Sequence, residues 1–550
     1  MKIKYLVVAP LIILYQVAFA QITERERPQI WSNLVSGARF MDRFLPMKGK
    51  VLSDGTWGAP QVKPRFVDNG IEDNIWSYWC GSIQKSDEGK YHMFVCGWLE
   101  ASPKGHFEWP NSYLFDATSD NLEGPYKLNK MIGKGHNVEA FRLADGRYVL
   151  YVIGGRYVAE KIGGPWQYDK FEFDERDRKV VEDMSNLSFA RREDGSYLMV
   201  NRGGGIWVSK DGLSKYGLLT EKSVYPAVDG EFEDPVIWKD HIQYHLIVND
   251  WLGRIAYYLR SKDGVNWVVD PGEAYAPGIA RHADGRSENW FKYERIKIYQ
   301  DSIGRAIQAN LAVVDVQKEE DFASDVHSSK QITIPLNPGL ILTVLNNNPI
   351  NKKTKEIRVK VHAEDGFDPN RDIDLSSLRF GASAEVNFGR GSILLGTQKE
   401  GSDLILIFDA SGSGITNDEF APKLIGKYAD GKMLFGFARL PYVNYNAPIL
   451  SARAPIITLE GDKWNSKINV ENFGQVLSKK SDVKVIYKKD GVTLFSSWGV
   501  IQPISPYSHS EIILKSKGEL LQGQEYEVTV SIVESNKIVS KFSFKSTIKD

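Results

Sequence analysis

The stretches Glu88-Gly89-Lys90-Tyr91, Asp145-Gly146-Arg147-Tyr148 and Asp194-Gly195-Ser196-Tyr197 repeat one short phrase between hydrophobic strands. Weaker copies follow at Asp240 to Tyr244 and at Ser302-Ile303-Gly304-Arg305. The marker positions 89, 146, 195, 241 and 304 are spaced 57, 49, 46 and 63 residues apart. A period of about 50 residues with about four strands in each unit is typical of a β-propeller. Five units therefore predict five blades.

The rest of the chain divides into segments of different character. After a leading segment at 21–65, we expect the propeller to occupy 66–340. Short strands separated by polar turns predict a β-sandwich at 341–450, and strands of immunoglobulin-like alternation predict a second sandwich at 451–550. Helical periodicity is scarce. The predicted fold class is therefore all-β, a five-bladed β-propeller followed by two β-sandwich domains that serve as spacers or as carbohydrate-binding modules.

The composition bears on the partners of the protein. The chain has 550 residues and a formal net charge of -1, so nothing in its charge predicts a nucleic-acid surface. It contains 25 Tyr, 25 Phe and 14 Trp. Aromatic faces can grip the C–H faces of sugar rings, but they also fill ordinary sheets, and composition alone leaves both interpretations open.

The first 20 residues have the pattern of a secretory signal peptide. A basic start is followed by an apolar stretch from Tyr5 to Phe19, which closes on Ala18-Phe19-Ala20. We expect cleavage after Ala20 and a protein that is secreted or periplasmic, with no membrane insertion after cleavage. A retained anchor is the alternative, although the segment is shorter than a spanning helix normally needs.

Export would place the two cysteines, Cys80 and Cys96, in an oxidising compartment. They flank the first turn on neighbouring strands, so they could form a cross-strand disulfide or remain as two buried free thiols. Neither has the spacing of a metal ligand, and we expect no metal site in the pocket.

The start of each innermost propeller strand points toward the axis, so counting back from the turns gives the expected pocket residues. The candidate catalytic residues from this count are His136, Glu139, Glu233, Asp234 and Glu294. In the first unit the count lands near Trp79, and Asp73, which lies six residues earlier, is a further catalytic candidate if that strand has a longer or bulged entry. The candidate substrate-binding residues are Asn137, Asn186, Arg202, Arg295, Trp76 and Trp251. Clustered carboxyl groups shift one another's pKa values, which separates an acid from a base or nucleophile and suits the cleavage of glycosidic bonds.

Structural roles could explain some of the same residues. Asp234 precedes Pro235, and such pairs commonly begin strands and turns. Glu294 and Arg295 could form an ion pair, and His136 could be a core histidine or a ligand for an ion or water in the pore.

Three segments carry a resemblance to a known family. Residues 81–94, the strand start 135–139 and the strand start 233–238 look like family-43 glycoside hydrolases and their five-bladed relatives. The resemblance implies an inverting hydrolysis with an Asp base, a second Asp that tunes pKa and a Glu acid. The base maps best to Asp73. The other two positions map to Asn137 and Asn186, which are neutral amides, so Glu139 or Glu233 would have to act as the acid.

Two other functions remain open from the sequence. His136, Tyr293 and Arg295, with the amides, suit β-elimination from a uronic acid by a lyase or a dehydratase. A propeller that binds glycans without catalysis would need the aromatic walls but fewer ionisable groups. The favoured function is hydrolysis at the ends of oligosaccharides from plant or algal polysaccharide. No cofactor is required, although a structural cation could occupy the propeller axis, and the oligomeric state is undetermined.

Overall fold

The computed structural model describes residues 22–53, 59, 62–460, 463–516, 520–521 and 523–547. The predicted signal peptide lies outside the described residues. The prediction of an all-β protein is confirmed, because strands dominate and α1 (Ser383–Val386) is the only α-helix in these ranges. Within the same ranges, no helix has both the length and the apolar character needed to cross a bilayer.

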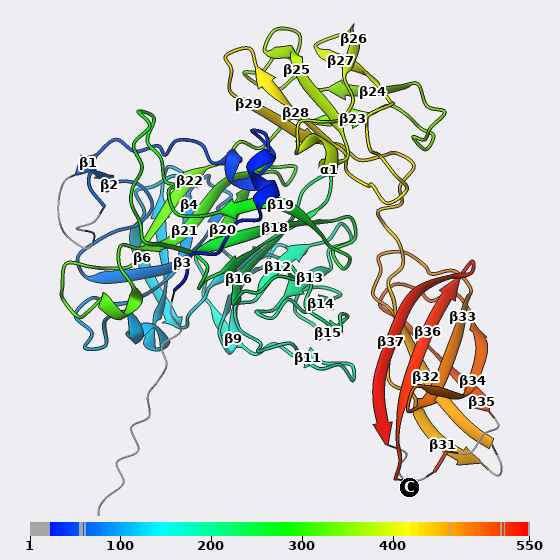
Figure 1. Ribbon diagram of the computed structural model, residues 1–550. Helices are drawn as coiled ribbons and strands as arrows, with labels where there is room; N and C mark the ends of the chain where they lie inside the picture. Colours follow the sequence, from blue (N-terminus) through cyan, green and yellow to red (C-terminus); the bar gives the residue numbers. More distant parts are fainter. Residues whose placement is uncertain are drawn as a thin grey trace, which may run out of the picture.

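The first part of the chain forms five successive antiparallel sheets (Figure 1). The first contains β3 (Trp76–Lys85), β4 (Tyr91–Leu99), β5 (Tyr113–Ser119) and β6 (Lys127–Lys134). The second contains β7 (Glu139–Arg142), β8 (Tyr148–Val152), β9 (Gly155–Ala159) and β10 (Gln167–Asp169). The third contains β12 (Ser188–Arg191), β13 (Tyr197–Val200), β14 (Ile206–Ser209) and β15 (Tyr216–Leu218), with β11 (Phe173–Asp174) parallel to β15 at its edge.

The fourth and fifth sheets follow the same order. The fourth contains β16 (Phe232–Lys239), β17 (Tyr244–Asp250), β18 (Ile255–Ser261) and β19 (Val268–Tyr275). The fifth contains β20 (Lys292–Gln300), β21 (Ala306–Val314) and β22 (Lys330–Pro335). The innermost strands β3, β7, β12, β16 and β20 contact one another in sequence, and β20 contacts β3, so the five sheets close into a ring.

The repeated turns join the first and second strands of their sheets. Gly89, Gly146 and Gly195 have φ of +90°, +97° and +87°. A side chain is unfavourable in this left-handed region, which explains why each turn carries glycine. The strands beside these turns are buried on both faces, as in β8, where all five residues are buried. Continuous hydrophobic runs at regular intervals are therefore the sequence signal of this ring.

The leading segment runs along the fifth sheet before the ring begins. It contains η1 (Gln29–Asn33), η2 (Phe40–Arg43), β1 (Leu52–Ser53) and β2 (Arg65–Phe66). Asn69 donates from Nδ2 to the Thr333 carbonyl at 2.8 Å and accepts from the Thr333 N–H at 2.9 Å, and Ile71 forms a bridge with Gln331. The three-stranded fifth sheet is therefore extended at its outer edge by residues that precede the first sheet.

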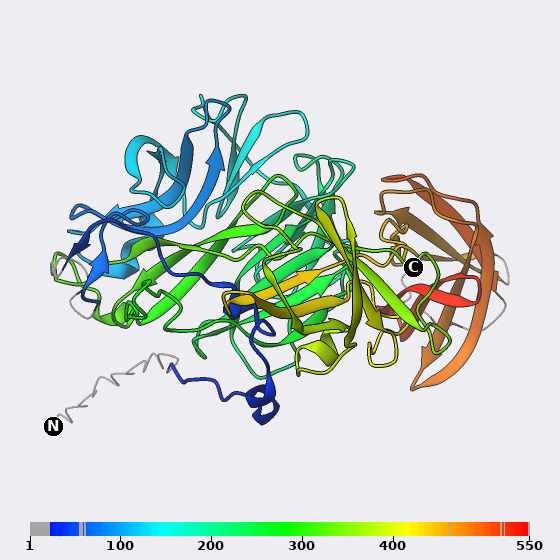
Figure 2. The ribbon, with the colours of Figure 1, turned by 90° about the horizontal axis from the view of Figure 1, so that it is seen from above.

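Two further pairs of sheets follow the ring (Figures 1 and 2). In the first pair, β23 (Leu342–Val344), β24 (Glu356–Val361), β27 (Asp403–Asp409) and β26 (Leu394–Glu400) share an apolar core with β25 (Ile373–Gly381), β28 (Lys423–Tyr428) and β29 (Met433–Phe437). In the second, one sheet has β32 (Lys463–Asn472) paired with β30 (Leu450–Ala452), β31 (Ile456–Glu460) and β35 (His509–Ser516). The other has β34 (Val492–Ile501), β33 (Ser481–Lys489), β36 (Glu525–Glu534) and β37 (Lys537–Thr547).

The cysteines are free, so the disulfide alternative is not realised. A bulge between Trp79 and Ser82 interrupts the pairing of β3 with β4, and Cys96 lies opposite Trp79. The Cys80 thiol remains next to Cys96 and donates to Asn137 Oδ1 at 3.2 Å. The bulge thus turns Cys80 toward the ring axis.

Candidate active site

A cavity of about 460 Å³ lies at the end of the ring where the innermost strands begin. We call it the axial pocket. Its walls combine aromatic, ionisable and amide side chains. They are Trp79, His106, Phe107, Trp109, His136, Asn137, Ile153, Asp183, Ser185, Asn186, Arg202, Glu233, Trp251, Glu294, Arg295, Lys318 and Glu319.

Each of the five innermost strands has one left-handed residue, within the strand or two residues before it, at the bottom of this pocket. The five residues are Cys80, Asn137, Asn186, Asp234 and Arg295, with φ of 62°, 62°, 54°, 58° and 53°. Non-glycine residues in this region cost about 1–3 kcal/mol each and persist only where surrounding contacts hold them. Bulges accompany them in β3, β16 and β20. The sequence counts therefore identify true axial positions in four of the five sheets, and Cys80 occupies the place in the first.

The side chains of these five residues bind one another across the axis. Asn137 donates from Nδ2 to Asn186 Oδ1 at 2.7 Å, and Asn186 donates from Nδ2 to Asp234 Oδ1 at 3.2 Å. Arg295 donates from Nη2 to Asn186 Oδ1 at 2.6 Å, and its Nε lies 2.8 Å from Asp234 Oδ1. This network forms a hydrogen-bonded floor that fixes the strand starts.

Glu233 and Glu294 form the acidic centre of the axial pocket, and each offers an oxygen within 4.8 Å of the other. Burial raises the pKa of Glu233 to about 7, and the negative charges of Asp234 and Glu294 add to the effect. Its side chain remains 17% exposed and lines the cavity. Glu233 is therefore a carboxyl group that still holds a proton near neutral pH.

Glu294 is held in the opposite state. Burial alone would raise its pKa, but Lys292 and Lys318 outweigh burial and lower it. Lys292 Nζ lies 3.0 Å from Oε1, and Lys318 Nζ lies 2.6 Å from Oε2. One pocket thus contains a protonated and an ionised carboxyl group, the pairing that acid–base catalysis requires.

The remaining cations and aromatic rings line the sides of the pocket. Arg202 lies 3.5 Å from Glu233 Oε2 and also faces Glu182 and Asp183. Lys318 lies over the ring of Trp79 at 5.1 Å, and Lys292 lies over the ring of Trp251 at 4.8 Å. One face of each indole is therefore covered by a lysine that also pairs with Glu294.

His136 is a neutral base on the wall of the axial pocket. Burial lowers its pKa well below the usual value, and the charge of Arg295 adds to this. Ser112 donates its hydroxyl proton to the Trp109 carbonyl at 2.5 Å, and its Oγ lies 2.9 Å from His136 Nδ1. Nδ1 must then be the protonated nitrogen, because the serine proton is already used. This leaves an unprotonated Nε2.

Four predicted site residues, Asp73, Trp76, Glu139 and Asp234, do not line this pocket, and these predictions are corrected. Asp73 accepts the N–H groups of Ile75 and Trp76 at 2.8 and 2.9 Å and binds the Tyr78 hydroxyl, so it organises the start of β3. Trp76 packs its half-buried ring against Tyr113 and Phe115.

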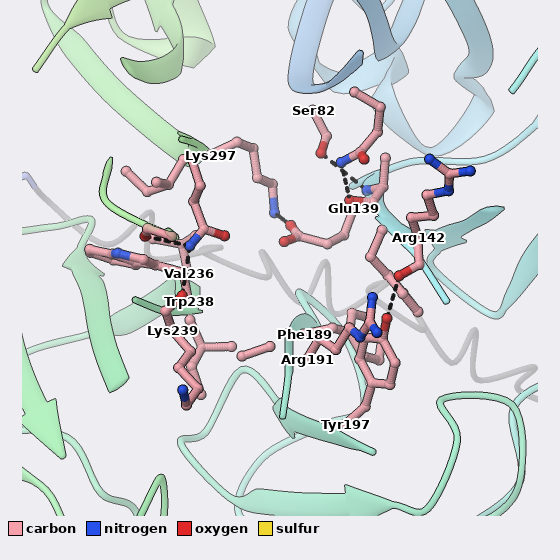
Figure 3. Close-up of a pocket in the computed structure, with 18 of the residues that line it drawn as sticks. Ser82, Glu139, Arg142, Phe189, Arg191, Tyr197, Val236, Trp238, Lys239 and Lys297 are labelled. Atoms are coloured by element: carbon pink, nitrogen blue, oxygen red, sulfur yellow. Dashed lines mark hydrogen bonds and ion pairs between the residues drawn. The ribbon is translucent and has the colours of Figure 1, made fainter. Parts of the chain in front are cut away.

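Glu139 is the third correction. It lies in a separate cavity of about 340 Å³ toward the opposite ends of the innermost strands, where its carboxylate pairs with Lys297 (Figure 3). It also accepts the Ser188 hydroxyl at 3.1 Å. Asn137 has a left-handed backbone and precedes β7, whereas Glu139 is the first residue of that strand, so the regular alternation of faces does not connect them and they line different cavities.

Asp234 lies in the floor and does not line the pocket. It is 2% exposed and is paired with Arg295. Of the predicted residues, the axial pocket brings together His136, Asn137, Asn186, Arg202, Glu233, Trp251, Glu294 and Arg295.

Counting back from the turns in the sequence missed the residues of one wall of the axial pocket. His106, Phe107 and Trp109 lie on η3 (Gly105–Asn111), and Lys318 and Glu319 lie on η4 (Lys318–Glu320). These short helices occupy the β4–β5 and β21–β22 connections. The only sequence signal was the unusual length of those connections, because their residues follow no strand periodicity.

Comparison with known proteins gave no match to a family model and no match to a curated protein. Solved structures with a partial likeness include Zg3597, a family 117 glycoside hydrolase of the marine bacterium Zobellia galactanivorans. It has 12% identity and a TM-score of 0.35, over 54% of this chain and 89% of that one. An α-L-arabinofuranosidase from Lactobacillus brevis has 11% identity and a TM-score of 0.34, over 48% and 92%.

A thermostable family-43 glycoside hydrolase has 12% identity and a TM-score of 0.30, over 48% of this chain and 90% of that one. These neighbours are glycoside hydrolases, but identity and structural overlap are both low. Any reaction proposed for this chain therefore rests on its own residues.

Proposed function

We propose that the protein is an exported glycoside hydrolase that acts on the ends of oligosaccharides from plant or algal polysaccharide. In this proposal the ring is a five-bladed β-propeller, and the two later sheet pairs are a β-sandwich and an immunoglobulin-like domain. The observation that carries the proposal is the pair Glu233 and Glu294, two carboxyl groups in one pocket whose surroundings move their pKa values in opposite directions.

The proposed reaction uses both groups directly. Glu233 donates its proton to the glycosidic oxygen as the bond to the anomeric carbon breaks, and the Glu294 carboxylate attacks that carbon from the other side. Water then releases the sugar from Glu294, with Glu233 accepting the proton. Carboxyl groups of inverting enzymes stand about 6.5–9.5 Å apart to admit a water, and those of retaining enzymes about 5–5.5 Å. Glu233 and Glu294 offer oxygens within 4.8 Å of each other, which is nearer the retaining spacing. We therefore propose retention, which departs from the inversion implied by the family-43 resemblance.

The shape of the pocket supports attack at chain ends. The walls from η3 and η4 enclose the side of the cavity nearest the first and fifth sheets. The half-buried Trp251 offers an apolar surface for a sugar ring, while Arg202 and Lys318 place positive charge where an acidic substituent could bind.

One observation favours a second candidate function. The unprotonated Nε2 of His136 could remove the C5 proton of a uronic acid, with Arg295 and the amides holding the sugar carboxylate. The product would be an unsaturated sugar, formed with release of a glycan by a lyase or with loss of water by a dehydratase.

A product assay separates the two reactions. The full chain is incubated with plant and algal oligosaccharides, including uronate-containing ones. Hydrolysis releases a saturated sugar with a new reducing end, and proton NMR should show that its first-formed anomer retains the substrate configuration. An ultraviolet-absorbing unsaturated product would identify elimination and overturn the hydrolase proposal. Binding without turnover across the panel would also overturn it and would favour a glycan-binding propeller.

A further inference from the structure

Three carboxylates gather behind the wall of the axial pocket, outside the catalytic pair. Glu100 directly follows β4, Asp321 directly follows η4, and Asp325 lies further along the same loop. Each offers one oxygen, and these oxygens all lie within 4.8 Å of one another. One cation with metal–oxygen distances of about 2.3–2.6 Å can reach all three.

An unpartnered oxygen points independently to a ligand here. Glu100 is only 6% exposed, and its Oε2 accepts the Ser77 hydroxyl at 2.5 Å. Within the described part of the chain, its Oε1 has no hydrogen-bond partner. Leaving a buried carboxylate oxygen without a partner is costly, and such groups are usually paired or bound to a metal.

The positively charged groups near the cluster do not neutralise its three carboxylates. Lys330 and His327 lie near the cluster, but each also faces another carboxylate. Lys330 Nζ faces Glu72 at 3.9 Å, and His327 Nδ1 faces Asp315 at 3.0 Å. His106 Nδ1 lies 3.5 Å from Asp321 and 2.9 Å from the Ser329 hydroxyl.

We propose that Glu100, Asp321 and Asp325 bind one calcium ion that joins the two loops behind the axial pocket. All three donors are carboxylate oxygens, which hard cations prefer, and calcium tolerates irregular sets of oxygen ligands better than magnesium does. The backbone already links the loops, since His106 N–H donates to the Asp321 carbonyl and Ser324 N–H donates to the Glu100 carbonyl, both at 3.0 Å. The ion would hold the two loops together where these hydrogen bonds already join them.

The two loops that the ion would join both present residues of the axial pocket. The first loop presents Trp109 on η3, and the second presents Lys318, which binds Glu294. Calcium would therefore act as a positioning ion with no part in the chemical steps. It differs from a cation in the propeller axis, because its ligands come from loops outside the ring of innermost strands.

The test uses the full chain, stripped with EDTA and titrated with calcium chloride by calorimetry. We expect one calcium per chain and a melting temperature that rises with calcium concentration, as linkage requires of a ligand bound only by the folded state. Glu100→Gln and Asp325→Asn should each weaken binding at least tenfold. Asp325 is partly exposed, so Asp325→Asn is the variant expected to fold normally.

Two controls make the assignment specific. Glu233→Gln, in the other acidic cluster, and Asp87→Asn, on the surface, should both bind calcium as the wild type does. Magnesium chloride should bind at least tenfold more weakly than calcium chloride. The proposal is overturned if wild type shows neither binding heat nor a melting shift, if both cluster variants bind normally, or if magnesium binds as tightly. None of these outcomes depends on the proposed hydrolase activity.

Discussion

Glu233 and Glu294 share one pocket, yet their neighbours drive them to opposite protonation states. Glu233 has two acidic neighbours and a single arginine 3.5 Å from its carboxyl group, whereas Glu294 touches two lysines at 2.6 and 3.0 Å. Residue type alone could not reveal this difference. It arises because Lys318 comes from a connection outside the strand repeat and reaches the pocket only after folding.

Glu233→Gln removes the proposed proton donor while keeping its size. General acid catalysis typically contributes 10²–10⁴-fold, so the rate of hydrolysis should fall by at least 100-fold. The melting temperature should stay within a few degrees, because the substitution keeps the size of the side chain and a pKa of about 7 leaves the neutral form well populated near pH 7. His136→Ala is the matched comparison. Hydrolysis that persists in Glu233→Gln but is lost in His136→Ala would reject the assignment of the acid.

The pH dependence of kcat/KM should report the titration of both carboxyl groups. Glu233 must be protonated to act, so kcat/KM should fall as the pH rises through about 7. Glu294 must be ionised, so the rate should fall again only at strongly acidic pH. A profile that instead rises from pH 6 to 8 would contradict a protonated Glu233.

Lys318→Met tests the cause of Glu294 ionisation. Loss of one lysine should raise the pKa of Glu294 and move the acidic limb of the pH–rate profile to higher pH. Lys318→Arg keeps the positive charge and should leave that limb near the wild-type position. If the acidic limb of both variants stays at the wild-type pH, Lys318 is not the cause of Glu294 ionisation.

At the scale of strands, the bulges decide which residues face the axis. Counting back from the turns located Asn137, Asn186 and Arg295 because those strands start at similar distances from their glycine turns. The count gave no axial acid in the first sheet, where Asp73 caps a turn and Cys80 takes the axial place. The spacing of the strands can be read from the sequence. A one-residue bulge, which exchanges the two faces of a strand, cannot.

Strands β7 and β20 are joined across the second cavity by the pair of Glu139 and Lys297 (Figure 3). Glu139→Gln would leave a buried lysine without its counter-ion, which costs about 3–5 kcal/mol. The melting temperature should fall clearly, while KM measured on the folded enzyme stays within twofold. Arg142→Gln, on the exposed rim of that cavity, is the control and should melt as wild type does. A large rise in KM without a loss of stability would instead place Glu139 in substrate binding.

At the scale of the molecule, the last pair of sheets is docked onto the ring. The Arg176 side chain is fully buried and lies 2.6 Å from Glu471, and it donates to the Ser451 carbonyl at 3.0 Å. Arg178 donates to the Ala452 carbonyl at 3.0 Å. Composition and turn signals predicted where sheets begin and end. They could not predict this contact, because its partners lie about 275 positions apart and no local pattern links them.

Weakening this interface should destabilise the ring. Glu471→Gln removes the charge that faces buried Arg176, so the melting temperature of the full chain should fall by several degrees. Glu511→Gln alters an exposed pair with Lys467 in the same domain and should have little effect. Equal melting temperatures for the two variants would indicate a tethered spacer rather than a docked domain.

The central claim is that the pocket holds Glu233 protonated near neutrality beside an ionised Glu294. Carbon-13 NMR of side-chain carboxyl groups in the full chain, with Glu233→Gln used to assign the signal, measures this without a substrate. The account predicts that the Glu233 carboxyl titrates at a pH of about 7, while Glu294 remains ionised throughout the accessible acidic range. A Glu233 signal that titrates near its ordinary value of about 4.3 would contradict it.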